Sequence, residues 1–385
     1  MSVARFDVAI VGAGPAGSAA ATSLARKGYS VVLLDKALFP REKLCGDFLS
    51  PINWRIFEQL GVAEELLSLE HEKITSFRIS VSSGEHATIG FPFRNGRRLF
   101  GLGMRRFFLD DLLLRAAEKQ GVVIRQGFQV RGIVREQGGW SLSLDGAFPE
   151  SRVQSVFLIG ADGRNSLVAH RLGLARKRES SENHLAFQAR LNGVKGLKGD
   201  VQIHGFPGGY AGLVGLGGGT ANLCFVVEKK KAKGAASPEA LWEHCLCRNP
   251  HLRESLRQGE IVSRVRSAFP VYFSPRRSYG DGFLLAGDAA RVTEPVTGEG
   301  VFFALKSGML SAEGIDSAFR KRNGSLEPFA SYDRLCREAF SLRQGVNRII
   351  RALVYHPSLL SPVVRLSAKT SFPLRALVHW LCRAV

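Results

Sequence analysis

The 385-residue chain is short of cysteine and of long apolar runs, and each shortage excludes a class of protein. Its six cysteines are scattered along the sequence, which excludes a disulfide framework and favours a reducing, cytoplasmic setting. No stretch of about 18 uncharged apolar residues occurs, so no membrane-spanning helix is expected. No signal or transit segment precedes the apolar strand that begins at Val8. The nine histidines show no metal-ligand spacing, and no metal site is predicted.

Acidic residues are also scarce, which leaves a formal net charge of +19. In residues 341–385, seven Lys and Arg residues stand among many aliphatic residues without a single Asp or Glu. Two interpretations fit this basic amphipathic helical tail. It lies on the anionic inner face of a membrane, or it packs on its own domain and shows a basic outer face. Nucleic-acid binding is not expected, because no nucleic-acid motif accompanies the charge.

What the sequence does contain begins with a nucleotide-binding pattern. An apolar strand leads into Gly12-x-Gly14-x-x-Gly17, an alanine-rich helix follows, and a second apolar strand ends at Asp35. The first glycine allows a tight turn, the second lets a pyrophosphate approach the backbone, and the third lets helix and strand pack closely. Asp35 is placed to accept hydrogen bonds from a ribose. This pattern predicts a Rossmann-type α/β sheet that binds a dinucleotide, without distinguishing FAD from NAD.

Two later apolar strands also end in a small residue and a carboxylate, at Asp162-Gly163 and at Gly287-Asp288. Open α/β sheets bind ligands at such strand ends. A loop after Asp288 leads to Gly298-Glu299-Gly300, which opens a new helix. Unpaired N–H groups near Gly298 can hold a ring that becomes anionic on reduction. The pattern therefore predicts a flavin site between a carboxylate and a helix N-terminus.

The order of these patterns predicts an α/β fold with a second, α+β lobe and three parts in all. Residues 1–74, 101–177 and 271–340 are expected to form a discontinuous FAD-binding domain. Residues 75–100 and 178–270 alternate in hydrophobicity or are rich in glycine, and they are expected to form an inserted β-sheet substrate domain. Residues 341–385 form the helical tail. The cluster Gly215-x-Gly217-Gly218-Gly219 is interpreted as a hairpin turn, because no helix period follows it.

With these motifs in place, the chain resembles the flavoprotein hydroxylase superfamily named after p-hydroxybenzoate hydroxylase, over nearly its whole length. The resemblance implies one bound FAD, with the glycine turn and Asp35 on the adenosine half, Asp162 and Gly163 near the dinucleotide, and Asp288 near the ribityl-pyrophosphate. Residues 104–114 look like the arginine helix of that superfamily, which implies that Arg106 contacts FAD. The alternative for Arg106 is a surface ion pair with Asp110.

Within the superfamily, the chain is most similar to the geranylgeranyl reductase group. Residues 41–46 resemble the loop of that group that carries a cysteine and a glycine beside the flavin, here Cys45 and Gly46. Residues 295–313 match its flavin-ring segment. Arg291 stands where typical hydroxylases have histidine, and the Trp-x-Trp-x-Ile-Pro motif of flavin halogenases is absent. Small residues follow Tyr210 where the group usually has aromatic ones, so the wall of the substrate pocket should differ.

The motifs and the resemblance together define the predicted cofactor set. It comprises Gly12, Gly14, Ala16, Gly17, Asp35, Lys36, Cys45, Gly46, Arg106, Asp162, Gly163, Gly287, Asp288, Pro295, Gly298, Glu299 and Gly300. Cys45 is also the candidate catalytic residue, as a proton donor if Arg41 and Lys43 lower its pKa. The alternative for Cys45 is a small residue that fills space.

The expected function is an FAD-dependent oxidoreductase acting on a hydrophobic substrate, such as an isoprenoid, polyketide or lipid-like molecule. Reduction or dehydrogenation of a C=C bond is favoured, with NAD(P)H or a small electron carrier as donor and a carrier or membrane delivering the substrate. Two alternatives stay open. One is a monooxygenase of an aromatic or quinone substrate, and the other is an electron-transfer flavoprotein that docks to a membrane partner.

Overall fold

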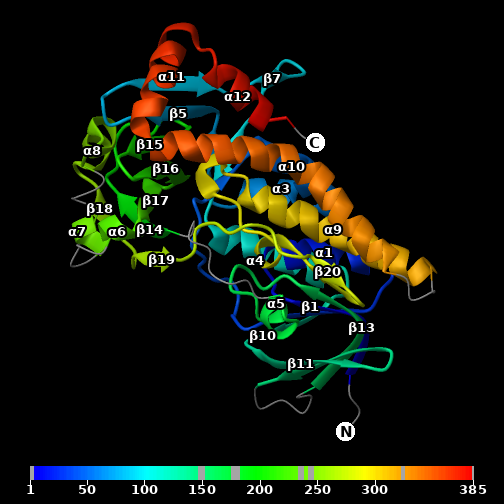
Figure 1. Ribbon diagram of the computed structural model, residues 1–385. Helices are drawn as coiled ribbons and strands as arrows, with labels where there is room; N and C mark the ends of the chain where they lie inside the picture. The colour runs from blue at the N-terminus through cyan, green and yellow to red at the C-terminus, as the bar shows by residue number, and fades with distance from the viewer. Residues whose placement is uncertain are drawn as a thin grey trace.

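Two sheets and a set of long helices build the molecule (Figure 1). The computed structural model describes residues 4–145, 152–174, 183–232, 238–241, 247–321 and 326–383. The first sheet is formed by β1 (Ala4–Val11), β2 (Val31–Asp35), β10 (Val123–Gln126), β11 (Val130–Glu136), β12 (Gly139–Leu144), β13 (Arg152–Gly160), β20 (Tyr279–Gly280) and β21 (Phe283–Leu285).

The centre of the first sheet is parallel, in the order β10-β2-β1-β13-β21. Its strands are continuous apolar runs because both faces are covered. On one face, α1 (Pro15–Ala25) packs against α4 (Arg106–Glu118) and α9 (Gly300–Lys321). On the other face, the core is completed by α5 (Leu167–Arg171) and the β11–β12 hairpin. This is the Rossmann-type arrangement that the glycine turn predicts.

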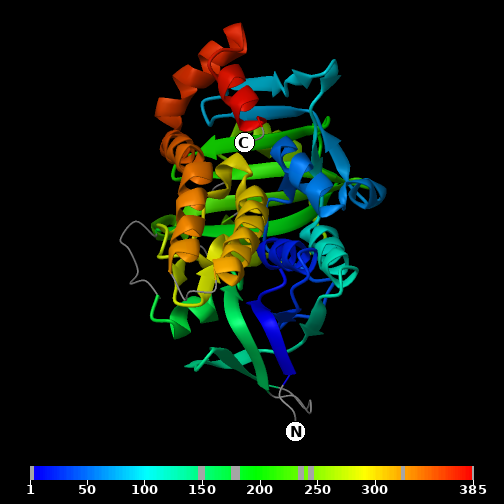
Figure 2. The ribbon, with the colours of Figure 1, turned by 90° about the vertical axis from the view of Figure 1, so that its right-hand side faces the viewer.

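The second sheet is mostly antiparallel, in the order β18-β14-β17-β16-β15-β5-β6, with β19 beside β14. Its strands are β5 (Ser76–Ser80), β6 (His86–Gly90), β14 (His184–Asn192), β15 (Asp200–Phe206), β16 (Gly209–Gly217), β17 (Thr220–Glu228), β18 (Glu260–Ile261) and β19 (Arg266–Ala268). The hairpin predicted at the second glycine cluster is confirmed, because β16 and β17 pair across it. Figure 2 shows these strands above the first lobe.

A small sheet lies between the lobes and consists of β3 (Phe48–Leu49), β9 (Gly101–Gly103) and β4 (Glu72–Ile74). It touches β16 so closely that a Cβ on Gly103 would lie 1.8 Å from the carbonyl oxygen of Gly215. The remaining described elements are α2 (Trp54–Leu60), α3 (Ala63–Ser68), the hairpin β7 (Phe93–Arg94) and β8 (Arg97–Arg98), α6 (Lys229–Ala232), α7 (Pro238–Leu241), α8 (Pro250–Leu256), and the 3₁₀ turns η1 (Pro51–Asn53), η3 (Gly287–Ala289) and η4 (Pro295–Thr297).

The C-terminal helices are α10 (Glu327–Tyr355), α11 (Pro357–Thr370) and α12 (Leu374–Leu381). The boundary predicted at residue 341 falls inside α10, which runs unbroken along α9. Both α11 and α12 pack on β6, and Leu360, Val364 and Val378 join the apolar core of the second sheet. The inner face of the tail thus packs on its own chain. Across the described ranges, no helix combines the length and apolarity needed to cross a bilayer.

Candidate active site

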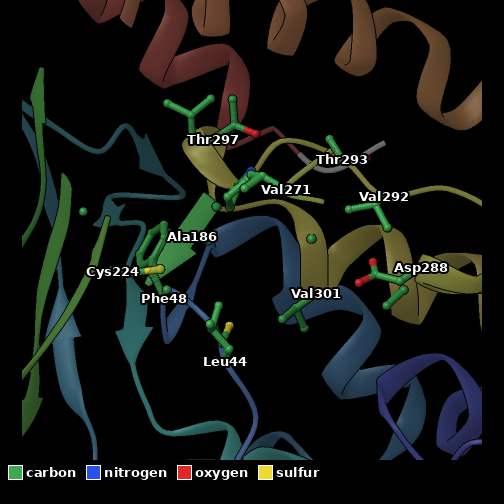
Figure 3. A pocket seen from close by; sticks show the side chains of 18 of the residues that line it. Leu44, Phe48, Ala186, Cys224, Val271, Asp288, Val292, Thr293, Thr297 and Val301 are labelled. Atoms are coloured by element: carbon green, nitrogen blue, oxygen red, sulfur yellow. The ribbon is translucent and has the colours of Figure 1, made fainter. Parts of the chain in front are cut away.

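A cavity of about 800 Å³ extends from the glycine turn of the first lobe to the face of the second sheet and the C-terminal helices. Figure 3 shows the region where the lobes meet, with Asp288 and Val301 on the first-lobe side and Ala186 and Cys224 on the second-sheet side. The charged residues of the lining all come from first-lobe segments, whereas the lining from the second sheet and tail is uncharged. The cavity therefore has a polar end and an apolar end.

Most of the predicted cofactor set meets at the polar end. The residues that line the cavity are Gly12, Gly14, Ala16, Asp35, Lys36, Cys45, Gly46, Arg106, Asp162, Gly163, Asp288, Pro295, Gly298 and Gly300. Gly17, Gly287 and Glu299 lie outside its lining. Gly17 faces the strand instead, where a Cβ would lie 1.8 Å from the carbonyl oxygen of Gly12. Its function is close helix–strand packing, as the motif predicts.

Glu299 differs from expectation. Its side chain is 1% exposed and forms an ion pair with the guanidinium of Arg343 on α10. Sequence spacing placed Glu299 next to the ring-binding glycines but could not show that its side chain points toward α10. The residue fastens the start of α9 to the tail and does not line the cavity.

Asp35, which was predicted to accept hydrogen bonds from a ribose, also stabilises the glycine turn. Its carboxylate accepts hydrogen bonds from the backbone N–H of Ala13 and of Ala37, both at 2.8 Å. Each carboxylate oxygen has a second lone pair, and the side chain is half-buried at the cavity wall. Asp35 can therefore orient the glycine turn and still accept a hydroxyl group from the cavity.

Two other groups that were predicted to contact the cofactor form hydrogen bonds within the protein. The Asp162 carboxylate accepts the hydroxyl of Ser166 at 2.5 Å and the N–H of Val168 at 3.1 Å, which ties it to the start of α5. The N–H of Gly298 donates to the carbonyl oxygen of Pro295 at 2.9 Å. The N–H groups left to receive an anionic ring are therefore those of the first turn of α9, beginning at Gly300.

The residues present fit a bound FAD, because three glycines leave room in the cavity wall. A Cβ added to Gly46, Gly163 or Gly300 would meet no protein atom within 4 Å. These positions come from three separate segments and surround the same polar end. A group of the length of a dinucleotide can therefore pass between them in contact with backbone, as the glycine pattern predicts.

A cluster of cations at the polar end was only partly predicted. Burial lowers the pKa of the Lys43 ammonium, and the neighbouring Arg106, Arg41 and Arg164 lower it further, while Asp288 opposes them. All five side chains belong to residues that line the cavity. A pyrophosphate placed here would neutralise charges that now repel one another. Sequence reasoning missed this use of Arg41 and Lys43, which it treated only as neighbours of Cys45, and it assigned no function to Arg164.

Arg106 forms an ion pair with Asp110, which was the alternative to its predicted contact with FAD. It holds both oxygens of Asp110, at 2.6 and 2.8 Å, and Arg41 approaches Asp110 at 3.2 Å. The pair is buried and not on the surface, since Asp110 is fully enclosed. Because Arg106 also lines the cavity, the ion pair positions its guanidinium there.

Cys45 stands where the two lobes touch. Its backbone N–H donates to Gln188 at 3.3 Å, and its carbonyl accepts from Asn222 at 3.1 Å. Burial raises the pKa of the Cys45 thiol, and the nearby Asp47 raises it further. The expected lowering of the Cys45 pKa is therefore wrong, because burial and Asp47 outweigh the opposing effect of Arg106.

The apolar end is built by side chains that share one face of the second sheet. From β16, the cavity is lined by Tyr210, Gly212 and Val214, which share one face of the strand, and also by Leu213 between them. Helices α10 to α12 close the opposite side with Leu353, Leu360 and other aliphatic residues. The tail was predicted either to lie on a membrane or to pack on its own domain, and its part in the wall of this cavity was not foreseen. The described residues contain no group of three His, Cys, Asp or Glu side chains arranged to hold a metal ion.

Comparison with known proteins supports FAD as the cofactor. Residues 5–327 match the model of the FAD binding domain family. The chain is 30% identical to menaquinone reductase of Mycobacterium tuberculosis over 322 residues, which cover 81% of this chain and 76% of the relative. It is 25% identical to digeranylgeranylglycerophospholipid reductase of Methanocaldococcus jannaschii, over 86% of this chain and 82% of the relative. It is 26% identical to tryptophan 2-halogenase of Chondromyces crocatus, over 80% and 61%.

Solved structures show the same fold. A geranylgeranyl bacteriochlorophyll reductase-like protein of Thermoplasma acidophilum superposes with a TM-score of 0.82, at 22% identity, over 95% of this chain and 92% of that one. A flavin-dependent brominase superposes with a TM-score of 0.81, at 24% identity, over 98% and 93%. The architecture is thus shared by reductases and halogenases, and the fold alone does not choose between them.

Proposed function

The chain belongs to the FAD binding domain family, and we propose that it reduces a carbon–carbon double bond in a polyprenyl lipid. It is an FAD-dependent oxidoreductase, as are its reductase and halogenase relatives. When bound, FAD supplies the two-electron chemistry, and NAD(P)H or a small electron carrier supplies the electrons. The observation that carries the proposal is the continuity of an uncharged apolar cavity with the polar cofactor end.

The apolar end suits a hydrocarbon chain for energetic reasons. Its walls are aliphatic and aromatic, contributed by β5, β15, β16, α10, α11 and α12. Each methylene buried there gains about 0.8 kcal/mol, while a charged group would lose its hydration without a partner. Small residues at Gly212 and Val214 widen this wall beside Tyr210. The relatives named for menaquinone and for digeranylgeranylglycerophospholipid support a lipid substrate.

The residues of this chain would then divide the work by position. Arg41, Lys43, Arg106 and Arg164 hold the pyrophosphate, and the first turn of α9 faces the ring. Closure by α10 to α12 excludes water from the reacting carbons.

Oxygen-dependent hydroxylation or halogenation is the second candidate, favoured by the similarity to tryptophan 2-halogenase. The absence of the Trp-x-Trp-x-Ile-Pro motif argues against halogenation. An electron-transfer role without a small-molecule substrate is opposed by the apolar end of the cavity, which extends beyond the polar cofactor end.

Product analysis separates these candidates. FAD-loaded enzyme is reduced without oxygen and incubated with detergent-dispersed menaquinone that carries an unsaturated side chain. The product is re-oxidised in air before mass spectrometry, so that a quinol ring returns to quinone. A gain of two hydrogens that survives re-oxidation marks side-chain reduction and supports the proposal. Oxygen incorporation seen only when the reaction itself is run under air, or bromine incorporation seen only under air with bromide, would establish the second candidate instead. An unchanged side chain with a reduced ring would support electron transfer.

We also propose that the outer face of the tail and the β7–β8 hairpin dock on an anionic membrane, from which the lipid enters. Phe93 and Phe372 are 64% and 63% exposed, and exposed Leu366 lies on the same helix as Lys369. The hairpin adds Arg94, Arg97 and Arg98, and it follows β6 directly, the strand on which α11 and α12 pack. Figure 1 shows β7 beside α12 at one end of the molecule. Residues 91–100 and 341–385 contain no acid, so their charge complements anionic lipid.

Vesicle flotation tests this surface. Binding is expected to vesicles that contain phosphatidylglycerol and to be lost with pure phosphatidylcholine or at high salt. The double variant Phe93→Ser, Phe372→Ser should reduce binding, whereas Leu38→Ser, an exposed residue of the first lobe, serves as the control. Equal flotation of both variants would contradict the proposal.

A further inference from the structure

A buried acid lies directly beside the cavity and is not part of the predicted cofactor set. Glu294 is 2% exposed, and its neighbours Thr293 and Pro295 both line the cavity. Its carboxylate is held by two phenols. Tyr210 donates to one oxygen at 2.7 Å, and Tyr355 donates to the other at 3.0 Å. A buried carboxylate between two tyrosines needs an explanation, because burial of an ionised group is costly.

The two phenols reach different compartments. Tyr210 lines the apolar cavity from β16. Tyr355, at the end of α10, lines a separate open cleft at the surface together with His356 and Lys231. The row Tyr355, Glu294, Tyr210 therefore connects the surface cleft to the cavity through two hydrogen bonds. Hydroxyl hydrogens rotate, so each phenol can exchange donor and acceptor roles along this row.

The surroundings of Glu294 disfavour its ionised form. Burial raises the pKa of Glu294, while Tyr210, Tyr355 and the more distant Arg351 only partly oppose it. Burial also raises the pKa of Tyr210, where Glu294, Tyr355 and Cys224 act in the same direction. His184 stacks on the Tyr355 ring at 4.1 Å, with Glu228, Arg351 and Lys230 as its charged neighbours. Asn347 fixes the backbone by donating to the Glu294 carbonyl and to Thr297 at 2.9 Å.

We propose that Tyr210 is the proton donor to the substrate and that Glu294 and Tyr355 return the proton to it from solvent. This rests on the proposed reduction of a double bond. One alkene carbon receives a hydride, and with it both electrons, from the reduced cofactor, while the other carbon receives the Tyr210 proton. The phenolate then takes the proton of Glu294, and the carboxylate regains one through Tyr355. The net change is one C=C bond replaced by two C–H bonds.

Four variants test the row, each conserving shape. They are Tyr210→Phe, Glu294→Gln, Tyr355→Phe and, as control, Tyr29→Phe. Tyr29 also donates to a carboxylate, that of Asp316 at 2.8 Å, but outside the cavity. The first measurement needs no substrate: the infrared band of a protonated carboxylic acid at neutral pH. Asp47 adds a component of its own to this band, because its pKa is raised to about 7. The test is therefore a second component, which should be present in wild type, lost in Glu294→Gln, shifted in Tyr210→Phe and unchanged in Tyr29→Phe.

The second measurement is side-chain reduction of menaquinone by pre-reduced enzyme, in single and in repeated turnover. Tyr210→Phe should slow the first turnover about 100-fold or more, the usual loss for a missing general acid. Glu294→Gln should leave the first turnover intact and slow later ones, because Tyr210 still carries its own proton. Tyr355→Phe should behave like Glu294→Gln.

The outcomes separate the relay from the reaction. Side-chain reduction at the wild-type rate by Tyr210→Phe would overturn the relay while the reductase proposal stands. Equal slowing of the first turnover by the variants of Tyr210, Glu294 and Tyr355 would assign these residues a structural role and would also overturn the relay. If wild type leaves the side chain unsaturated, the reductase proposal fails and the relay falls with it.

Discussion

Arg343 fastens the C-terminal helices to the helix that faces the predicted flavin ring, and its removal should be costly. Its side chain is 3% exposed and pairs with Glu299 at the start of α9. It also donates to the carbonyl oxygens of Leu381, at 3.4 Å, and Arg383, at 2.6 Å, and it lies 4.8 Å from the centre of the Trp380 ring. One guanidinium therefore joins α9, α10 and α12.

The variant Arg343→Met keeps much of the apolar stem but leaves the Glu299 carboxylate buried without a cation. Removing one partner of a buried pair costs about 3–5 kcal/mol in the free energy of unfolding. Burial already raises the pKa of Glu299, against the pull of Arg343, so the variant raises it further. A raised folded pKa means that stability is lost as pH rises through it. The defect should therefore be larger at pH 8 than at pH 5.

Urea unfolding at fixed FAD concentration measures the effect. Arg337→Met is the matched control, because Arg337 forms an exposed pair with Asp333 on the same helix, worth about 0.3–0.5 kcal/mol. Adding Glu299→Gln to Arg343→Met should recover part of the loss, since the unpaired charge is gone. Equal losses for Arg343→Met and Arg337→Met, or no recovery in the double variant, would refute this reasoning.

Three further predictions follow from single side chains. Asp35→Ala should weaken FAD retention, measured by fluorescence of the released cofactor; full occupancy after gel filtration would contradict its assignment to the ribose. Gly300→Ala should weaken FAD binding but leave the apoprotein as stable as wild type, because its Cβ meets no protein atom, whereas Gly17→Ala should destabilise the apoprotein by collision with Gly12. Burial raises the pKa of Asp47 to about 7, so this carboxyl should cost wild type up to roughly 4 kcal/mol of stability as pH rises from about 4 to 7, and Asp47→Asn should lose that much less. Parallel pH curves of unfolding for the two proteins would count against that shift.

The C-terminal helices belong to the core of the second sheet, so point variants test membrane docking better than deletion of the tail. Deletion of the chain after Pro357 would remove Leu360, Val364 and Val378 from the second-sheet core, so loss of vesicle binding could reflect unfolding. Exposed residues such as Phe372 can be changed without opening that core. The tail thus has two faces with different functions, one in the cavity wall and one toward solvent.

The sequence predicted the fold and the cofactor from local rules. A glycine turn between two apolar strands demands the same backbone wherever it occurs, so Gly12, Gly14 and Asp35 could be placed without coordinates. Strand ends of a parallel sheet meet at one edge, which brought Asp162 and Asp288 to the same cavity. Each of these inferences depends on residues that are close in sequence or on one repeated unit of structure.

Only the tertiary structure decided the directions of side chains and the partners that come from distant segments. It turned Glu299 toward Arg343, 44 residues away, and it placed Asp110 under Arg106 in a buried pair. It showed that burial raises the pKa of Cys45, whereas the sequence showed only that an arginine and a lysine are nearby. It also joined Tyr210, Glu294 and Tyr355 in one row. These contacts depend on how two sheets and a helical tail pack together, and no local pattern encodes that packing.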